Sequence, residues 1–213
     1  MIVRCALAIA FIASQLAVRA QDNWKLDTEK EGIKIYKTAV PDSKVKAVRV
    51  IAMLDTDLSQ LVSVLMDVNT GSQWVYHTKS SVLIKKVSPS ELYYYSEVDL
   101  PWPCENRDFV AHLTVTQDPR TKAVTIDGPA VPGYVPLKHG IVRIGHSKGK
   151  WILSPVGNKV KVEYTLQVDP GGAIPAWLVN VFAAQGPLES FRKLKAQLKK
   201  PTFQGAKLSY IQD

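Results

Sequence analysis

Glu97 and Asp99 are the pair of residues whose spacing most suggests catalysis, because two carboxylates on one face of a strand can serve as general acid and general base. They lie in a segment in which apolar and polar residues alternate, so that successive side chains point to opposite faces of a strand. The alternation predicts that Tyr94, Ser96 and Val98 face inward and that both carboxylates face outward. The segment is therefore expected to offer the interior a phenol, a hydroxyl and an apolar side chain, not paired acids.

The other reactive side chains show no pattern of a catalytic or metal site. A zinc or iron site needs several converging donors, and the spacing of metal ligands is absent among His77, His112, His139 and His146. Cys104 has no evident base partner, so a structural thiol is expected. The titratable groups expected to point inward are Tyr94, Tyr164 and His139. They leave open an enzyme, a cyclase or hydrolase acting on a hydrophobic small molecule, as the alternative to a binding protein.

The first twenty residues have the pattern of an export signal. In this chain of 213 residues, Arg4 precedes an apolar run that is short for a bilayer span and that reaches small residues at Ala20. We expect a cleaved signal peptide over 1–20, in preference to a retained membrane anchor, and a soluble periplasmic or secreted protein. Cleavage would remove Cys5 and leave Cys104 as the one cysteine, so no internal disulfide is expected.

The charge of the chain indicates a class of partner. The net charge is +8, and the loss of Arg4 and Arg19 with the signal peptide would reduce it to +6. This excess favours transient contact with an anionic membrane surface, and the expected contact residues are Lys193, Lys195 and Lys199. No nucleic-acid-binding motif appears, so no nucleic-acid partner is expected, and we expect a monomer.

The longest predicted helix lies within Gly171–Lys200 and decides the class of fold. Its apolar residues recur at helical spacing, and Pro175 suits a first helical turn. Pro187 lacks the N–H that would bond the carbonyl of Ala183, which predicts a kink. The face expected to turn inward includes Trp177, Val181 and Gln185. One long amphipathic helix requires a sheet against which to pack.

Most of the chain before this helix alternates as strands do. Eight or nine antiparallel strands are predicted, with a helix that is capped by Asp57 or Ser59 and ends near Asn69–Gly71, and a helical turn between Asn23 and Glu31. The inward residues of two later strands are Phe109, Ala111, Leu113 and Val115, and Tyr164 and Leu166. The sequence thus predicts one α+β domain over 21–200, followed by a tail over 201–213 that is loose or packed on the outside.

An apolar loop, GPAVPGYVPLKHG, interrupts the strands between Gly128 and Gly140. It contains three prolines and three glycines and few charged residues. Loops of this length within a compact domain are typically functional, so this loop is a candidate part of the site.

Three segments together resemble the START family of lipid-transfer domains. The first is Tyr95–Pro103 followed by Asn106–Val110, the second is Gly149–Pro155, and the third is Val162–Gln185 with its pattern DP-G--P-WLVN. The resemblance covers Trp24 to Lys200 in order and spacing. It implies a helix-grip fold, in which a strongly curved antiparallel sheet grips the C-terminal helix and one hydrophobic ligand lies between them. It also implies no cofactor and no catalytic constellation.

The resemblance further implies where the ligand would lie. START domains carry a loop that gates the mouth of the tunnel, which here corresponds to Val135, Pro136, Leu137, His139 and Gly140. The expected cavity wall is made of Tyr94, Ser96, Val98, Phe109, Ala111, Leu113, Val115, Tyr164, Leu166, Trp177, Val181 and Gln185.

One position departs from the pattern of the family. Several cholesterol-binding members carry a buried arginine where this chain has Leu113, paired with an acid near the place of Tyr94. The cavity is thus expected to offer a phenol and no ion pair, which suits a mostly apolar ligand with a hydroxyl or a small polar head. We expect the protein to carry such a lipid between membranes, and a sensor that binds lipid without transferring it is a further alternative.

Overall fold

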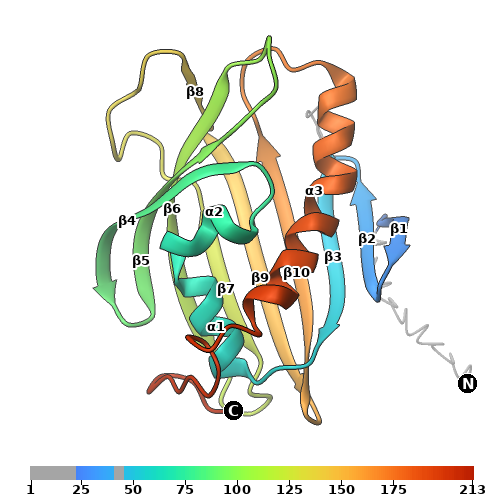
Figure 1. Ribbon diagram of the computed structural model, residues 1–213, viewed down its shortest axis with the longest axis vertical. Helices are drawn as coiled ribbons and strands as arrows, with labels where there is room; N and C mark the ends of the chain where they lie inside the picture. The colour runs from blue at the N-terminus through green and yellow to red at the C-terminus, as the bar shows by residue number, and fades with distance from the viewer. Residues whose placement is uncertain (1–22, 41–45) are drawn as a thin grey trace, which may run out of the picture.

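The computed structural model of the protein describes residues 23–40 and 46–213, so the predicted signal peptide lies outside the described residues. The architecture is a curved sheet with helices on one face, and the longest helix, α3 (Ala176–Gln197), lies along that face (Figure 1). The helices α1 (Leu58–Met66) and α2 (Gly71–Trp74) and the 3-10 helix η1 (Val68–Thr70) lie beside it. The predicted α+β helix-grip fold is confirmed.

Ten strands form the sheet, where the sequence predicted eight or nine. Their order in space is β1-β2-β3-β10-β9-β7-β6-β5-β4, and the short β8 pairs with β6 in parallel while the other pairings are antiparallel. The bounds are β1 Lys25–Lys30, β2 Ile33–Thr38, β3 Ala47–Leu54, β4 Thr78–Ser88, β5 Glu91–Val98, β6 Asn106–Gln117, β7 Val124–Pro129, β8 Ile141–Arg143, β9 His146–Val156 and β10 Lys159–Asp169.

The two halves of α3 have different surroundings. Its C-terminal half packs into the hydrophobic core through Phe191 and Leu194, which are fully buried, and Leu198 continues this contact just after the helix. Arg192 fixes the same half to the turn before β2 through an ion pair with Glu31, at 2.6 Å. The N-terminal half lies over the sheet at the other end of the molecule, which is also the end of the β5–β6 connection (Figure 1).

Two segments differ from the sequence prediction. The residues around Asp27 form an edge strand, β1, and not a helical turn, because their backbone pairs with β2 in an antiparallel register. The tail after Lys200, predicted to be loose or packed on the outside, is packed and contributes side chains to the core. Phe203 and Ile211 belong to the hydrophobic core, and the Asp213 carboxylate accepts a hydrogen bond of 2.7 Å from the backbone N–H of Ser59.

A buried ion pair holds β8 against β6. The Asp108 carboxylate accepts hydrogen bonds from Nε and an Nη of Arg143 at 2.6 and 3.0 Å, and Arg143 also donates to the backbone carbonyls of Val135 and Pro136. Both side chains are buried, at 1% and 9% exposed respectively. The strand β8 and the loop before it are thus fixed to β6 by one guanidinium group.

Candidate ligand-binding cavity

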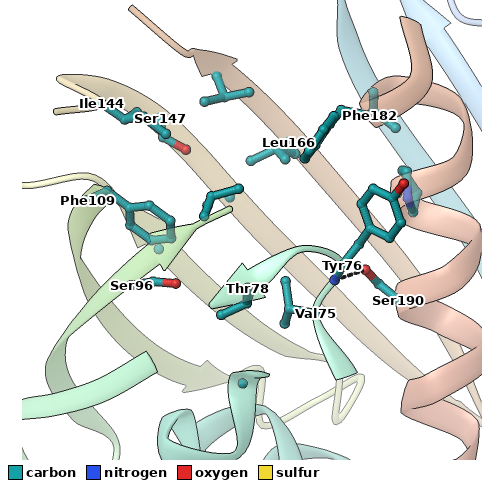
Figure 2. Close-up of a pocket in the computed structure, with 18 of the residues that line it drawn as sticks. Val75, Tyr76, Thr78, Ser96, Phe109, Ile144, Ser147, Leu166, Phe182 and Ser190 are labelled. Atoms are coloured by element: carbon teal, nitrogen blue, oxygen red, sulfur yellow. Dashed lines mark hydrogen bonds between the residues drawn. The ribbon is translucent and has the colours of Figure 1, made fainter. Parts of the chain in front are cut away.

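A cavity of about 360 Å³ lies between the sheet and the N-terminal half of α3 (Figure 2). Its wall is mostly apolar and comes from strands β3, β4, β5, β6, β7, β9 and β10, the segment from Leu65 to Tyr76, α3 and the connections before β6, β9 and α3. Among the described residues, the ionisable side chains other than tyrosines that line it are Lys46, Asp67 and Arg107. A volume of this size is in the range of pockets that hold one small molecule.

Stacked aromatic rings separate the cavity from the hydrophobic core. Trp151 stacks on Tyr164, with ring centroids 4.2 Å apart, and on Phe191 at 5.7 Å. Trp74 meets Trp151 edge-on at 6.4 Å. These rings supply a rigid apolar surface on which a hydrocarbon ligand can rest.

Two tyrosine hydroxyls face the interior without partners. Tyr94 comes from β5 and Tyr164 from β10, and neither hydroxyl has a hydrogen-bond partner among the described residues. Burial raises the pKa of Tyr94 to about 12, and burial together with the nearby Tyr94 raises the pKa of Tyr164. Both groups therefore stay protonated at neutral pH and can donate or accept a hydrogen bond.

The raised pKa of Tyr94 predicts a loss of stability in alkali. The unfolded pKa is about 10, so the contribution of the neutral phenol is complete below pH 10 and is lost as pH rises to about 12. We expect Tyr94→Phe to reduce the alkaline loss of the free energy of unfolding over this interval by about 2 to 3 kcal/mol. Urea denaturation at a series of pH values measures it.

The control for this prediction is the same substitution at Tyr93, on the opposite face of β5, where the ring stacks on His112 at 4.3 Å. A Tyr94→Phe protein with the same alkaline profile as the unmodified protein would contradict the assigned burial of this phenol.

Arg107 closes the end of the cavity near the start of α3. Its side chain is buried, and its guanidinium donates hydrogen bonds to the backbone carbonyls of Glu105, Pro170 and Gly171 at 2.5, 3.2 and 3.2 Å. The positive φ of Gly171, 65°, lets the chain turn tightly there before the helix. Arg107 thus ties the β10–α3 connection to β6.

The covering half of α3 contacts the segment after α2. The hydroxyl of Ser190 accepts a hydrogen bond of 3.0 Å from the backbone N–H of Tyr76, and the ring of Tyr76 meets Phe182 edge-on at 5.3 Å (Figure 2). Pro187 lies inside the helix and lines the cavity, where its ring removes one backbone hydrogen bond. Among the side chains described in this half of the helix, the polar contact to the segment after α2 is thus the one made by Ser190.

The comparison with known proteins agrees with this geometry. The sequence profile described as the START domain matches residues 6–203. The chain belongs to the START domain family. The crystal structure of a STAR-related lipid transfer protein from Xanthomonas axonopodis matches this START domain with a TM-score of 0.78 and 36% identity, covering 84% of this chain and 100% of that chain.

Two curated sequences are also similar to this START domain. The phosphatidylcholine transfer protein of Mus musculus is 30% identical over 176 residues, which are 80% of this chain and 81% of that protein. An uncharacterized protein of Pseudomonas aeruginosa is 31% identical over 186 residues, which are 84% of this chain and 88% of that protein. The match thus extends over most of each chain.

The residues predicted to form the wall of this START domain are divided between the cavity and other places. Those that line the cavity are Tyr94, Ser96, Val98, Phe109, Leu113, Tyr164 and Leu166. Ala111 is buried on the same strand face without lining the cavity, and Val115 packs in the hydrophobic core. Strand alternation therefore gave the correct inward faces of β5, β6 and β10.

The predicted helix face needs a correction. Gln185 is exposed and does not line the cavity, Val181 is half-buried outside the wall, and nothing is described for the side chain of Trp177. The helix is rotated by about one residue from the predicted orientation. Its cavity face runs through Leu178, Val179, Phe182, Ala183, Gly186, Pro187 and Ser190.

The loop predicted as a gate lies elsewhere. None of Val135, Pro136, Leu137, His139 and Gly140, all of them described, lines the cavity. Tyr134 stacks on Tyr93 at 4.6 Å and the Lys138 ammonium lies 4.1 Å from the ring centre of Tyr95, and both of these β5 residues point away from the cavity. The loop is therefore held on the outer face of the sheet, and α3 with the connection before it covers the cavity instead.

Of the lysines predicted to contact a membrane, Lys193 and Lys195 lie in the C-terminal half of α3, and Lys199 lies just after the helix. Lys193 and Lys199 are exposed, whereas Lys195 is half-buried and donates a hydrogen bond of 2.8 Å to the backbone carbonyl of Glu31. They lie toward the end of α3 away from the β5–β6 connection (Figure 1). Their role at a membrane stays a prediction.

Sequence reasoning missed several wall residues, above all Trp74, Tyr76 and Trp151, because an aromatic residue is most often part of a packed core. The sequence did contain one signal for the wall on β7 and β9, the glycines Gly128 and Gly149. They pair with each other across these two strands. A Cβ at Gly128 would lie 2.7 Å from Cδ2 of Leu113, so the wall residue needs a glycine opposite it.

No metal or membrane-spanning site is evident in the described part of the chain. Within residues 23–40 and 46–213, no three His, Cys, Asp or Glu side chains are grouped as metal ligands. None of the helices described there is both long and apolar enough to cross a bilayer.

Proposed function

We propose that this START domain binds one lipid in the cavity under α3 and carries it between membranes. The observation that supports the proposal best is a mostly apolar cavity covered by half of a helix whose other half is anchored in the core. The similarity to the lipid transfer proteins of Xanthomonas axonopodis and Mus musculus supports the same activity.

The energetics of transfer favour such a cover. Burial of one CH₂ group contributes ~0.8 kcal/mol relative to water, so a sixteen-carbon chain gains roughly 13 kcal/mol. A membrane offers the lipid nearly the same gain, which makes exchange between membrane and cavity close to balanced. The barrier is the exposed intermediate, and a cover that opens at the membrane surface lowers it.

Trp102 is the surface residue best suited to make the membrane contact. It is 91% exposed in the β5–β6 connection, and Leu100 in the same connection lines the cavity. Figure 1 shows this connection at the same end of the molecule as the start of α3. Tryptophan partitions into the interface of a bilayer, so insertion of this side chain would bring the cover to the membrane.

We expect the protein to move a fluorescent lipid from donor to acceptor vesicles and Trp102→Ser to slow this transfer about tenfold. The substitution removes a side chain that makes little contact with the rest of the fold, so the free energy of unfolding should change by less than ~0.5 kcal/mol. Stopped-flow transfer kinetics and urea denaturation measure the two effects.

A matched control removes an exposed apolar side chain at the other end of the molecule. Val156, at the β9–β10 turn, is 50% exposed, and Val156→Ser should leave transfer unchanged. If Lys193→Glu/Lys199→Glu slows transfer and Trp102→Ser does not, the membrane contact lies at the cationic end of α3 and not at Trp102. Binding of lipid without any transfer would indicate a sensor, and chemical conversion of the bound lipid, followed by mass spectrometry, would indicate an enzyme.

A further inference from the structure

The two unpartnered tyrosine hydroxyls in the cavity come from distant parts of the sheet. Strands β5 and β10 are separated in the sheet by β9, β7 and β6, yet Tyr94 and Tyr164 line the same cavity. The Tyr164 hydroxyl lies beside Gly149, 3.8 Å from the position that a Cβ would take there. The interior of the cavity therefore presents two phenol groups that can donate or accept a hydrogen bond.

Among the described residues, the charged side chains that line the cavity are Lys46, Asp67 and Arg107, and none of them contributes to the raised pKa of Tyr94 or Tyr164. Arg107 lies at the β10–α3 end of the cavity and already donates to three backbone carbonyls. On β6, Arg107 pairs with Val98 of β5, whereas Tyr94 pairs with Ala111. Arg107 is therefore four residues along the strand from the level of Tyr94. Lys46 is exposed to solvent. A phosphate or carboxylate placed between the tyrosines would therefore be buried without a counter-charge, which is costly.

The size of the cavity favours a compact ligand. Its volume of about 360 Å³ suits one small lipid, whereas a two-chain phospholipid would require outward movement of α3. The Leu113 side chain also lines the cavity, and it occupies the space that the missing side chain of Gly128 leaves.

We infer, on the basis of the proposed function, that the ligand is an uncharged lipid with a hydroxyl or carbonyl oxygen, held head inward between the Tyr94 and Tyr164 hydroxyls. A hydroxyl on the ligand would donate to one phenol and accept from the other, and a carbonyl would accept from both. The hydrocarbon part would then lie against Phe109, Leu166 and the cover residue Phe182, which line the rest of the cavity (Figure 2).

The test compares lipid classes extracted from one set of vesicles. The vesicles are dioleoylphosphatidylcholine with small and equal mole fractions of cholesterol, monooleoylglycerol and squalene, a hydrocarbon without oxygen. The full chain is incubated with them and reisolated, and its bound lipids are quantified by mass spectrometry. We expect cholesterol or monooleoylglycerol to be enriched over phosphatidylcholine relative to the vesicle composition.

The double variant Tyr94→Phe/Tyr164→Phe removes both hydroxyls and keeps both rings. We expect the enrichment of the oxygen-bearing lipid to fall about tenfold, since a neutral hydrogen bond contributes a factor of about 2 to 10, while squalene extraction is retained. Retained squalene also shows that the variant is folded. The control is Tyr93→Phe, which removes a hydroxyl from the outer face of β5 and should leave every extraction unchanged.

Two results would overturn the inference and leave the proposed function standing. One is a preference of the unmodified protein for phosphatidylcholine over the uncharged lipids. The other is an unchanged enrichment in the double variant. Failure to extract any lipid class would instead reject the proposed function, and the inference with it.

Discussion

Replacement of Leu166 by tryptophan is expected to lower lipid extraction from vesicles more than tenfold. Leu166 lies on β10 in the wall of the cavity, and its side chain points into the space beneath Phe182 of the cover (Figure 2). An indole at this position would occupy volume that the ligand needs. Overpacking usually costs ~1–3 kcal/mol of stability, but a partly empty cavity can take up part of the added volume.

The adjacent residue provides a matched control for this variant. Gln167 lies on the same strand, is exposed, and points to the opposite face of the sheet. Gln167→Trp adds the same indole outside the cavity and should extract lipid at the rate of the unmodified protein. Equal extraction by Leu166→Trp and Gln167→Trp would show that the lipid does not bind under α3.

Removal of the Asp108 carboxylate is expected to reduce the free energy of unfolding by about 3–5 kcal/mol, because Asp108→Ala leaves the buried guanidinium of Arg143 without its counter-charge. The contacts of Arg143 with the carbonyls of Val135 and Pro136 would also weaken. Urea denaturation followed by tryptophan fluorescence measures the loss.

Two further variants separate the ion pair from other effects. Asp127→Ala removes a carboxylate whose pair with Lys150 is half-exposed at 3.5 Å, and it should cost less than ~1 kcal/mol. The double variant Asp108→Leu/Arg143→Met removes both buried charges and should recover much of the stability lost in Asp108→Ala. The free energy of unfolding lost in this double variant should be smaller than the sum of the losses in Asp108→Leu and in Arg143→Met. A loss equal to that sum would contradict the assigned interaction between Asp108 and Arg143.

The sequence could predict the faces of strands well, because strand periodicity depends on the backbone alone. Alternation in β5 and β6 placed Tyr94, Ser96 and Phe109 toward the interior without any knowledge of the partner strands. The edge strand β1 escaped prediction because its pattern is mostly polar, and its pairing with β2 decided its structure.

The orientation of α3 was harder to predict than its existence. A helical turn of 100° per residue means that a shift of one position moves a side chain from the wall to the solvent, and Gln185 shows this shift. The close approach of Gly186 to the Tyr76 ring, 3.2 Å from the position a Cβ would take, and the hydrogen bond from the Tyr76 N–H to Ser190 hold this face of the helix against the segment after α2. Both are tertiary effects that apolar periodicity does not contain.

The position of the loop before β8 depends on contacts between residues far apart in the chain. Its apolar composition suggested a gate, but Tyr134, Lys138 and Arg143 bind it to the outer face of β5 and β6. The stacking of Tyr134 on Tyr93 joins residues about forty positions apart, and no local pattern shows it.

The hydrogen bonds that Arg107 donates to the connection before α3 affect how the ligand specificity of such a domain can change. It binds the carbonyl oxygens of Pro170 and Gly171, and main-chain oxygens are present whatever the side chains are. Substitutions in the connection before α3 can therefore alter its apolar or charged character without loosening its attachment to β6. The covering segment can diverge to suit different cargoes or membranes while the arginine keeps its path constant.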